Sequence, residues 1–193
     1  PEDPLEESLR ALTLRYGQSL EHARAVRSLT ESLYTSLESV HGLSDKWKRP
    51  LRAAAMLHDI GQAVDYENHE RHGCFLMMNV PMYGLTHHER CLAAALVGMH
   101  RLQNENADLF GAEKLLNGRD FTELPRAALL LKLAEEMQRC APGRLQQVEC
   151  YPDGKIIYMI MRTSGASREI AAALAMRTSG LFAQIYAKKL LII

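Results

Sequence analysis

The sequence predicts a mainly α-helical protein that ends in a small α+β unit. Through the first 143 residues, apolar side chains recur at the spacing of helices that bury one face. Pro142-Gly143 ends this pattern, and two short runs of strand-forming residues follow around Pro152-Asp153-Gly154, a strong turn signal. We therefore predict a helical domain over residues 1–143 and a small domain of β-β-α-β order over 144–193.

The helices are expected between residues that start or stop helices. Gly17 separates the first two, Asn68 can cap a later one, and Thr86 to Glu89 has the form of a capping box. Residues 101–121 form a looser stretch, after which Pro125 lies in the first turn of the last helix of this domain. The predicted helices cover 5–16, 19–40, a segment from about Pro50 to Asp59, 69–79, 86–100 and 124–139.

The C-terminal elements follow from the same rules. Residues 145–151 and 155–162 are expected to form a hairpin, because both are rich in strand formers and flank a turn. Ser167 can cap an alanine-rich helix to about residue 178, with an irregular continuation beyond Gly180 left open, and residues 188–193 read as a final strand.

Composition narrows the function classes. Hydrophobic residues make up 47% of the 193 residues, enough for a sizeable core. Lys plus Arg and Asp plus Glu both number 23, so no global field favours duplex nucleic acid or an anionic membrane. The apolar runs are shorter than the ~20 residues of a membrane span, so we expect a cytoplasmic protein. The first residue is Pro1 rather than Met, from which we expect a fragment or a processed form.

Several helices direct a histidine or a carboxylate toward their apolar face. A single such histidine is usually a core residue bonded to a carbonyl group, but here the pattern repeats on five helices. A buried polar group without a partner costs about 1–3 kcal/mol, so we expect these side chains to meet around a shared cation or anion. The expected metal ligands are His22, His58, Asp59, His72, His100 and Glu135, with His69 as an additional candidate.

His58-Asp59 is the central motif of this set. It follows the apolar segment Leu51 to Leu57, and Gly61 is expected to end the helix in a left-handed turn. The pair would then lie at a helix C-terminus, where partial negative charge favours a cation.

The residue types indicate a class of chemistry. Imidazole and carboxylate ligands suit zinc, manganese, iron or magnesium, and the scattered cysteines argue against a closed structural zinc site. A divalent metal with an open position acidifies water that can attack phosphorus, so we expect hydrolysis of a phosphate ester or anhydride, with His58 and Asp59 catalytic. Four basic residues near these ligands can clamp phosphate oxygens or simply lie on solvated helix faces: Arg52, Arg71, Arg101 and Lys132.

These residues resemble the HD superfamily of metal-dependent phosphohydrolases. The resemblance rests on the order His22, His58-Asp59-Ile60-Gly61, His69-x-x-His72, Glu89, His100 and Leu133-Ala134-Glu135. With Tyr16-Gly17, His22-Ala23, Ala55 to Gly61, Asn68 to His72 and the β-α-β tail, nearly the whole chain is similar to the C-terminal half of bacterial exopolyphosphatases and guanosine pentaphosphate phosphatases.

The resemblance implies an HD-domain-like helical bundle, a homodimer and binding of long polyphosphate along a basic channel. In that family the exopolyphosphate-cleaving machinery lies in an N-terminal actin-like region, which this sequence does not contain. Many HD phosphohydrolases end their ligand set with aspartate, whereas the matching position here is Glu135.

Three hypotheses follow. The chain is an HD-type phosphohydrolase acting on polyphosphate or nucleotide phosphate, or a non-catalytic polyphosphate-binding and dimerisation module of a larger protein, or a purely structural helical domain.

Overall fold

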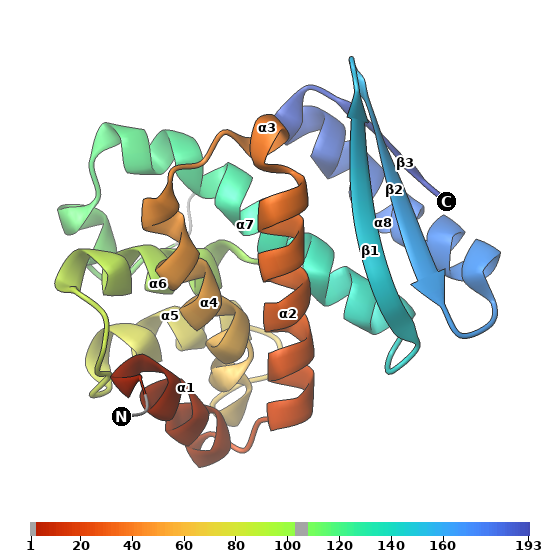
Figure 1. Cartoon of the computed structure of the whole chain (residues 1–193). Coiled ribbons are helices and arrows are strands. Elements are labelled where there is room, and N and C mark those ends of the chain that lie inside the picture. Colours follow the sequence, from red (N-terminus) through yellow and green to blue (C-terminus); the bar gives the residue numbers. More distant parts are fainter. Residues whose placement is uncertain (1–2, 103–107) are drawn as a thin grey trace.

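The computed structural model describes residues 3–102 and 108–193, and it confirms a mainly helical chain with a small sheet near its C-terminus (Figure 1). The region expected to be loose, 101–121, lies partly outside the described residues. Helices precede the sheet, in the order α1 (Pro4–Arg15), α2 (Leu20–Ser36), α3 (Glu38–His41), η1 (Asp45–Trp47), α4 (Lys48–Leu57), η2 (Ile60–Ala63), α5 (His69–Asn79), α6 (His87–Met99), η3 (Ala112–Leu115) and α7 (Gly118–Cys140).

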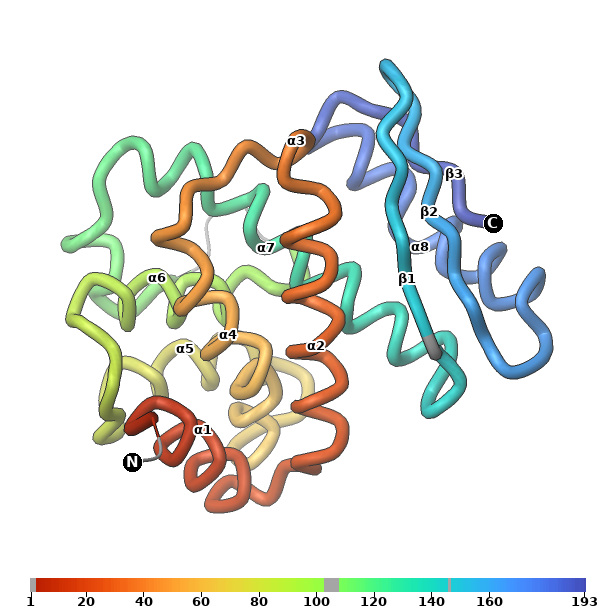
Figure 2. Tube along the Cα trace, viewed as in Figure 1, coloured from red at the N-terminus to blue at the C-terminus, as the bar shows by residue number. Residues whose placement is uncertain are grey.

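The C-terminal unit has the expected β-β-α-β order. Strand β1 (Leu145–Asp153) pairs antiparallel with β2 (Ile156–Thr163), and β3 (Lys189–Ile192) adds parallel to β2 after the crossover helix α8 (Ser167–Tyr186). The sheet order is β1-β2-β3. Strand β1 packs beside α2 and helix α8 packs against α7, so the small unit lies at one side of the helices (Figures 1 and 2). The boundary that we predict at residue 143 falls between α7 and β1.

Helix α6 forms the centre of the core. Its residues from Cys91 to Gly98 are all buried, and it contacts α4, α5 and α7. The capping box predicted at its start is confirmed, because the side chains of Thr86 and Glu89 each accept a backbone N–H of the other. Within the described residues, no helix combines the length and apolar character that a membrane crossing requires.

Gly61 does not end a helix as predicted. Its φ is not positive, and it lies inside η2, where its missing side chain lets two segments meet. A Cβ at this position would lie 1.9 Å from the carbonyl oxygen of His69 and 2.5 Å from the amide nitrogen of Gly73. The glycine is therefore required for close packing of η2 on α5, which brings the segment after α4 next to His69.

Other helix ends also differ from expectation. Asn117 caps α7 with Asp120, so α7 begins six residues before the predicted start, at residue 118 rather than 124, and Pro125 lies inside it. The predicted helix 19–40 is interrupted at Leu37, and the continuation of α8 beyond Gly180 is regular helix as far as Tyr186. Asn68 occupies the N-cap position of α5, but its side chain donates to Asp65 instead.

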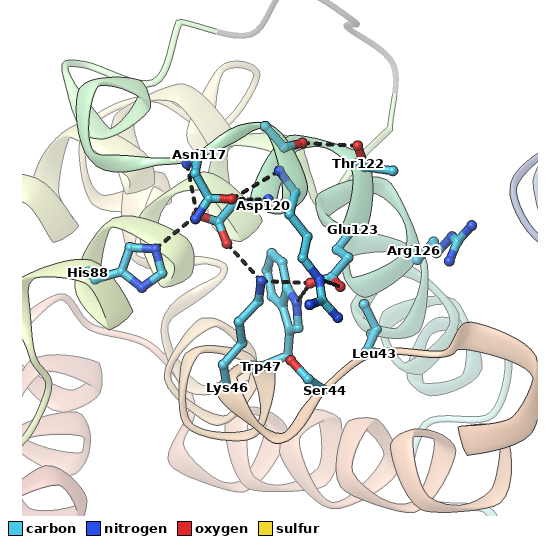
Figure 3. A network of polar contacts seen from close by, with 12 residues as sticks. Leu43, Ser44, Lys46, Trp47, His88, Asn117, Asp120, Thr122, Glu123 and Arg126 are labelled. Carbon is cyan, nitrogen blue, oxygen red and sulfur yellow. Dashed lines mark hydrogen bonds and ion pairs between the residues drawn. The ribbon is translucent and has the colours of Figure 1, made fainter.

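A buried ion-pair network fixes the beginning of α7 (Figure 3). Lys46 Nζ lies 2.9 Å from Asp120 Oδ1 and 2.8 Å from Glu123 Oε2, and Trp47 Nε1 donates to the same glutamate oxygen at 2.7 Å. His88 Nε2 lies 2.9 Å from Asp120 Oδ2. The network thus ties η1 and the start of α6 to α7.

The Gly61 contact predicts a steric effect on stability. Gly61→Ala should lower the free energy of unfolding by about 1–3 kcal/mol, because the new methyl group meets backbone atoms that cannot turn away. Urea denaturation followed by circular dichroism measures the effect. Gly180→Ala is the matched control: Gly180 lies in α8 with open space around it, so alanine should raise stability by about 0.5–1 kcal/mol. Equal stability of Gly61→Ala and wild type would contradict the packing role.

The Lys46 network predicts a loss of stability in acid. Burial opposes ionisation of both carboxyls, but the Asn117 amide, Lys46 and His88 lower the pKa of Asp120 from 3.8 to about 2. Lys46, Trp47 and Arg119 likewise lower the pKa of Glu123 from 4.5 to about 2. The unfolded chain therefore takes up protons first, so stability should be full above pH 4.5 and fall as pH drops toward 2.

Asp120→Asn should flatten this fall relative to wild type, as measured by urea midpoints across the same pH window. Glu7→Gln, a change at an exposed residue outside the network, should leave the slope as it is. A slope in Asp120→Asn as steep as in wild type would show that another group controls the acid transition.

Candidate metal centre

Five side chains from four helix ends meet beside η2. His22 lies in the first turn of α2, His58 and Asp59 directly follow α4, His69 begins α5, and His100 directly follows α6. His58, His69 and His100 are almost completely buried, whereas His22 keeps 40% of its side chain exposed and Asp59 keeps 18%. The cluster therefore opens to solvent on the side of His22.

Asp59 occupies the middle of the cluster. Its Oδ2 lies 3.3 Å from His58 Nε2 and 3.8 Å from His22 Nε2, while its Oδ1 lies 3.3 Å from His69 Nε2. His69 Nε2 is in turn 3.2 Å from His100 Nε2. The two carboxylate oxygens thus face different histidines.

Three of the histidines have their rings fixed by backbone carbonyls three residues earlier. Nδ1 lies 2.9 Å from the Ala55 oxygen in His58, 2.8 Å from the Tyr66 oxygen in His69 and 2.7 Å from the Val97 oxygen in His100. Because a carbonyl oxygen only accepts, each Nδ1 carries the proton and donates. The Nε2 atoms of the neutral rings then present lone pairs toward Asp59 and one another.

Arg101 bears on the assignment for His69. Its guanidinium lies 3.3 Å from His69 Nδ1, and the guanidinium has only donors. The shorter 2.8 Å contact with the Tyr66 carbonyl decides the tautomer, so His69 Nδ1 carries a proton and Arg101 lies beside the ring without donating to that nitrogen. The carbonyl partner orients the ring as the outer contacts of metal-binding histidines do.

This arrangement leaves lone pairs uncompensated. In neutral rings protonated at Nδ1, the facing Nε2 atoms of His69 and His100 are both acceptors, and at 3.2 Å they repel unless a proton or a cation lies near them. Among the described residues, the buried Nε2 of His58 has no hydrogen-bond partner. A buried polar atom left in this way costs about 1–3 kcal/mol, so the residues present fit a bound cation.

Glu135, in the last turns of α7, belongs to the same electrostatic environment. Its carboxylate is buried, and Oε1 accepts from Arg139 at 2.5 Å. Within the described chain Oε2 makes no hydrogen bond, although Lys132 Nζ lies 3.8 Å away. Burial raises the pKa of Glu135, but His100, Lys132 and His58 lower it further, so the side chain is an anion.

The pKa shifts in the cluster follow from burial and from the charges of the Asp59 and Glu135 carboxylates. Burial lowers the pKa of His100 to about 4 despite the nearby charge of Glu135. Burial also lowers the pKa of His58, but Asp59 and Glu135 outweigh it and the net shift is upward. Burial raises the pKa of Asp59, yet His58, His100 and His69 hold it well below its usual range. The cluster therefore holds two carboxylates in their charged form beside the neutral imidazole of His100.

Two groups of three residues in this cluster could each hold one cation. One comprises His22, His58 and Asp59, and the other comprises Asp59, His69 and His100; in each group the ligand atoms lie within 4.8 Å of one another. Asp59 is common to both, with one oxygen toward each. A carboxylate placed in this way can bridge two ions.

The structure places some of the expected residues elsewhere. His72, expected as a ligand, lies one turn further along α5 than His69, and its Nε2 is 4.0 Å from Asp65 in the preceding connector. His69, named only as an additional candidate, lies inside the cluster because it is the first residue of the helix. The helical spacing alone does not distinguish these two histidines.

The four basic residues expected to bind phosphate also divide into two pairs. Arg101 contacts His69 of the cluster and Lys132 lies 3.8 Å from Glu135, whereas Arg52 pairs with Glu31 and Arg71 pairs with Asp108. Sequence reasoning missed two residues near the site: Arg139, which pairs with Glu135, and Tyr66, whose ring centroid lies 6.1 Å from that of His69. Arg139 could have been found from the sequence, because it follows Glu135 by one helical turn. Tyr66 lies in a polar connector without periodicity, so no such signal pointed to it.

Fold and site together define a helical domain with a candidate metal centre and a small α+β unit at its end. Residues 6–152 match the model of the Ppx/GppA phosphatase family, domain III, and the chain belongs to this family. The match extends from α1 into β1 and so includes every residue of the cluster. The resemblance seen in the sequence is thus confirmed at the level of the family.

Three curated relatives carry the name guanosine-5'-triphosphate,3'-diphosphate pyrophosphatase. The protein of Aeromonas hydrophila is 32% identical over 96 residues, which are 49% of this chain and 19% of that protein. The protein of Aeromonas salmonicida is 34% identical over 83 residues (42% and 17%), and that of Pseudoalteromonas atlantica is 43% identical over 53 residues (28% and 10%). The matched region is therefore a small part of each relative.

Proposed function

We propose that this chain carries an HD-type, metal-dependent phosphohydrolase centre that acts on phosphate esters or anhydrides, such as polyphosphate or a nucleotide. The observation that carries the proposal is the pair of facing Nε2 atoms of His69 and His100, 3.2 Å apart beside the Asp59 carboxylate. Such an arrangement suits a divalent cation of the manganese, magnesium, zinc or iron type.

In this proposal each side chain has one role. His22 and His58 would hold an ion with Asp59, His69 and His100 could hold a second one with the same carboxylate, and Glu135 would supply negative charge from α7. A divalent metal bound there would acidify water and polarise a phosphoryl oxygen. Asp59 is the residue on which both ligand groups depend, and His58 is fixed against the Ala55 carbonyl to present Nε2 to it.

Arg139 is a candidate phosphate-binding residue. Its side chain is half exposed, and its guanidinium is already oriented by Glu135 and Glu136. A guanidinium held in this way can donate its remaining N–H groups to phosphate oxygens. Arg101 and Lys132 are closer to the buried side and are proposed to balance the charge of the carboxylates.

A second function is favoured by the small share of each relative that the chain matches. The whole relatives are several times longer than the matched region, so this domain can serve as a polyphosphate-binding and dimerisation module of a larger phosphatase. The two functions differ in whether phosphate is released, and both differ from a purely structural domain in binding a ligand.

Metal content tests the ligand set. Protein purified without a nickel column and soaked in manganese should retain the ion, and Asp59→Ala should lose it because both groups of ligands lose their shared carboxylate. His22→Ala and His69→Ala should each lose only part of the bound metal, and elemental analysis by mass spectrometry gives the amounts.

His72→Ala is the matched control, because His72 is a histidine of the same helix as His69 but lies beside Asp65. Its metal content should equal that of wild type. Metal retention in Asp59→Ala, or a loss in His72→Ala as large as that in His69→Ala, would contradict the proposed set.

Phosphate release tests catalysis. With manganese present, wild type should release phosphate from polyphosphate or a nucleotide, and Asp59→Ala should reduce turnover to background with helical circular dichroism preserved. Binding of polyphosphate that weakens with salt, without any release, would instead support the accessory module, since exposed charge contacts are screened over about 8–10 Å. If the chain shows no binding and no release, both functions are excluded.

A further inference from the structure

Two consecutive glutamates near the end of α7 share two basic side chains of the same helix. Glu135 and Glu136 are 5% and 2% exposed, so both carboxylates depend on partners within the protein. Lys132 Nζ lies 2.8 Å from Glu136 Oε1 and 3.8 Å from Glu135 Oε2. Arg139 has the opposite preference, with 2.5 Å to Glu135 Oε1 and 3.8 Å to Glu136 Oε1. Each glutamate therefore has one near cation and lies within reach of the cation that the other one holds.

A third cation comes from the C-terminal unit. Arg177 of α8 donates from Nη1 to Glu136 Oε2 at 3.4 Å. The two cations of α7 contact the other oxygen of this carboxylate, so Oε2 has Arg177 as its partner within the described chain. Ion pairs between two exposed side chains contribute little to stability. Here, however, the Glu136 side chain is only 3% exposed, so loss of Arg177 would leave buried charge without compensation.

Glu135 connects this group of charges to the candidate metal centre. Burial lowers the pKa of His22, His58 and His100, and the charge of Glu135 raises the pKa of all three. Oε1 of Glu135 is held by Arg139, while Oε2 is buried and makes no hydrogen bond with the described residues. The Arg139 contact therefore sets the orientation of the carboxylate whose charge reaches the cluster.

We propose that Arg177 is a positioning residue for the candidate metal centre. By neutralising Glu136, it leaves Arg139 to hold Glu135 in its present orientation. Without Arg177, the Glu136 carboxylate would draw Arg139 across the 3.8 Å between them and away from Glu135. The C-terminal unit would thereby control the charge arrangement at a centre whose five cluster residues all precede α7. This inference rests on the proposed function and names what regulates the same site.

A simpler explanation is that Arg177 only fastens α8 to α7. The two helices also meet through Tyr186, whose hydroxyl donates to the Arg126 carbonyl at 2.7 Å. Arg126 precedes Glu136 by about 15 Å along α7, at 1.5 Å per residue, so this hydrogen bond fastens the same helices at a distance from both glutamates. Loss of the Tyr186 hydroxyl therefore separates fastening from positioning.

The affinity of the full chain for manganese tests the positioning role, with free Mn²⁺ measured by electron paramagnetic resonance. Arg177→Ala should weaken binding about three- to tenfold, less than the roughly 10–100-fold loss seen when a direct partner of a metal ligand is removed. Arg177→Lys keeps the charge and should bind nearly as wild type does. Tyr186→Phe is the matched control: it should unfold at a lower urea concentration than wild type and bind manganese normally.

A double mutant separates charge from packing. Glu136→Gln removes the carboxylate that Arg177 neutralises, so Arg139 stays on Glu135 and manganese affinity should be close to that of wild type. Glu136→Gln combined with Arg177→Ala should then regain most of the affinity that Arg177→Ala alone loses. If Arg177 only fastened the helices, Arg177→Ala and Glu136→Gln would both lower stability, and neither would change manganese affinity.

Equal manganese affinity of Arg177→Ala and wild type, an equal loss in Tyr186→Phe, or no recovery in the double mutant would each overturn the positioning role. Circular dichroism checks that each variant is folded, and Arg177→Gln takes the place of Arg177→Ala if alanine prevents folding. These outcomes leave the metal centre in place as long as wild type holds manganese. If wild type binds no manganese, the proposed function fails, and the positioning role fails with it.

Discussion

The rest of the structure depends on one constraint: imidazole nitrogen lone pairs face one another around the Asp59 carboxylate. His58, His69 and His100 each donate from Nδ1 to a carbonyl, and this leaves their Nε2 atoms directed into a small buried space with Asp59. Such a space is costly in an isolated protein core, because acceptors face acceptors. The helices that converge there, and the glycine contact that brings η2 onto α5, are arranged around this unfavourable concentration of polar atoms.

Helix α7 connects the candidate centre to a second polar assembly. Its first turns hold Asp120 and Glu123 in the Lys46 network, and its last turns hold Glu135 and Glu136 beside Lys132 and Arg139. With 23 residues, the helix is about 34 Å long at 1.5 Å per residue. Its buried anions are all paired with cations, which lets a long central helix carry charge through an apolar core.

Much of the fold was predictable from the sequence, because helix periodicity, the capping box at Thr86 and the turn after β1 are local signals. The helix ends were less predictable. Gly61 has the residue type of a helix stop, but its role is set by a contact with α5 that no local pattern reveals. Pro125 looked like a first-turn residue, yet Asn117 begins the helix earlier because its capping bonds outweigh the preference of proline.

The candidate site was predictable as a set of side chains and not as an arrangement. Histidines on apolar faces indicated that residues such as His58 and His100 would be buried, but the choice between His69 and His72 depended on where α5 begins. Arg139 and Tyr66 lie on no apolar face, so their relation to the cluster required the tertiary structure.

The carbonyl contacts of His58 and His100 have a consequence for the helices themselves. Each ring donates to a carbonyl in the last turn of its own helix, where carbonyl groups lack partners within the helix. These histidines therefore act as C-terminal caps of α4 and α6 as well as cluster residues. Fraying of either helix end would rotate a ring away from Asp59. The geometry of the site therefore depends on the local order of the C-terminal ends of α4 and α6.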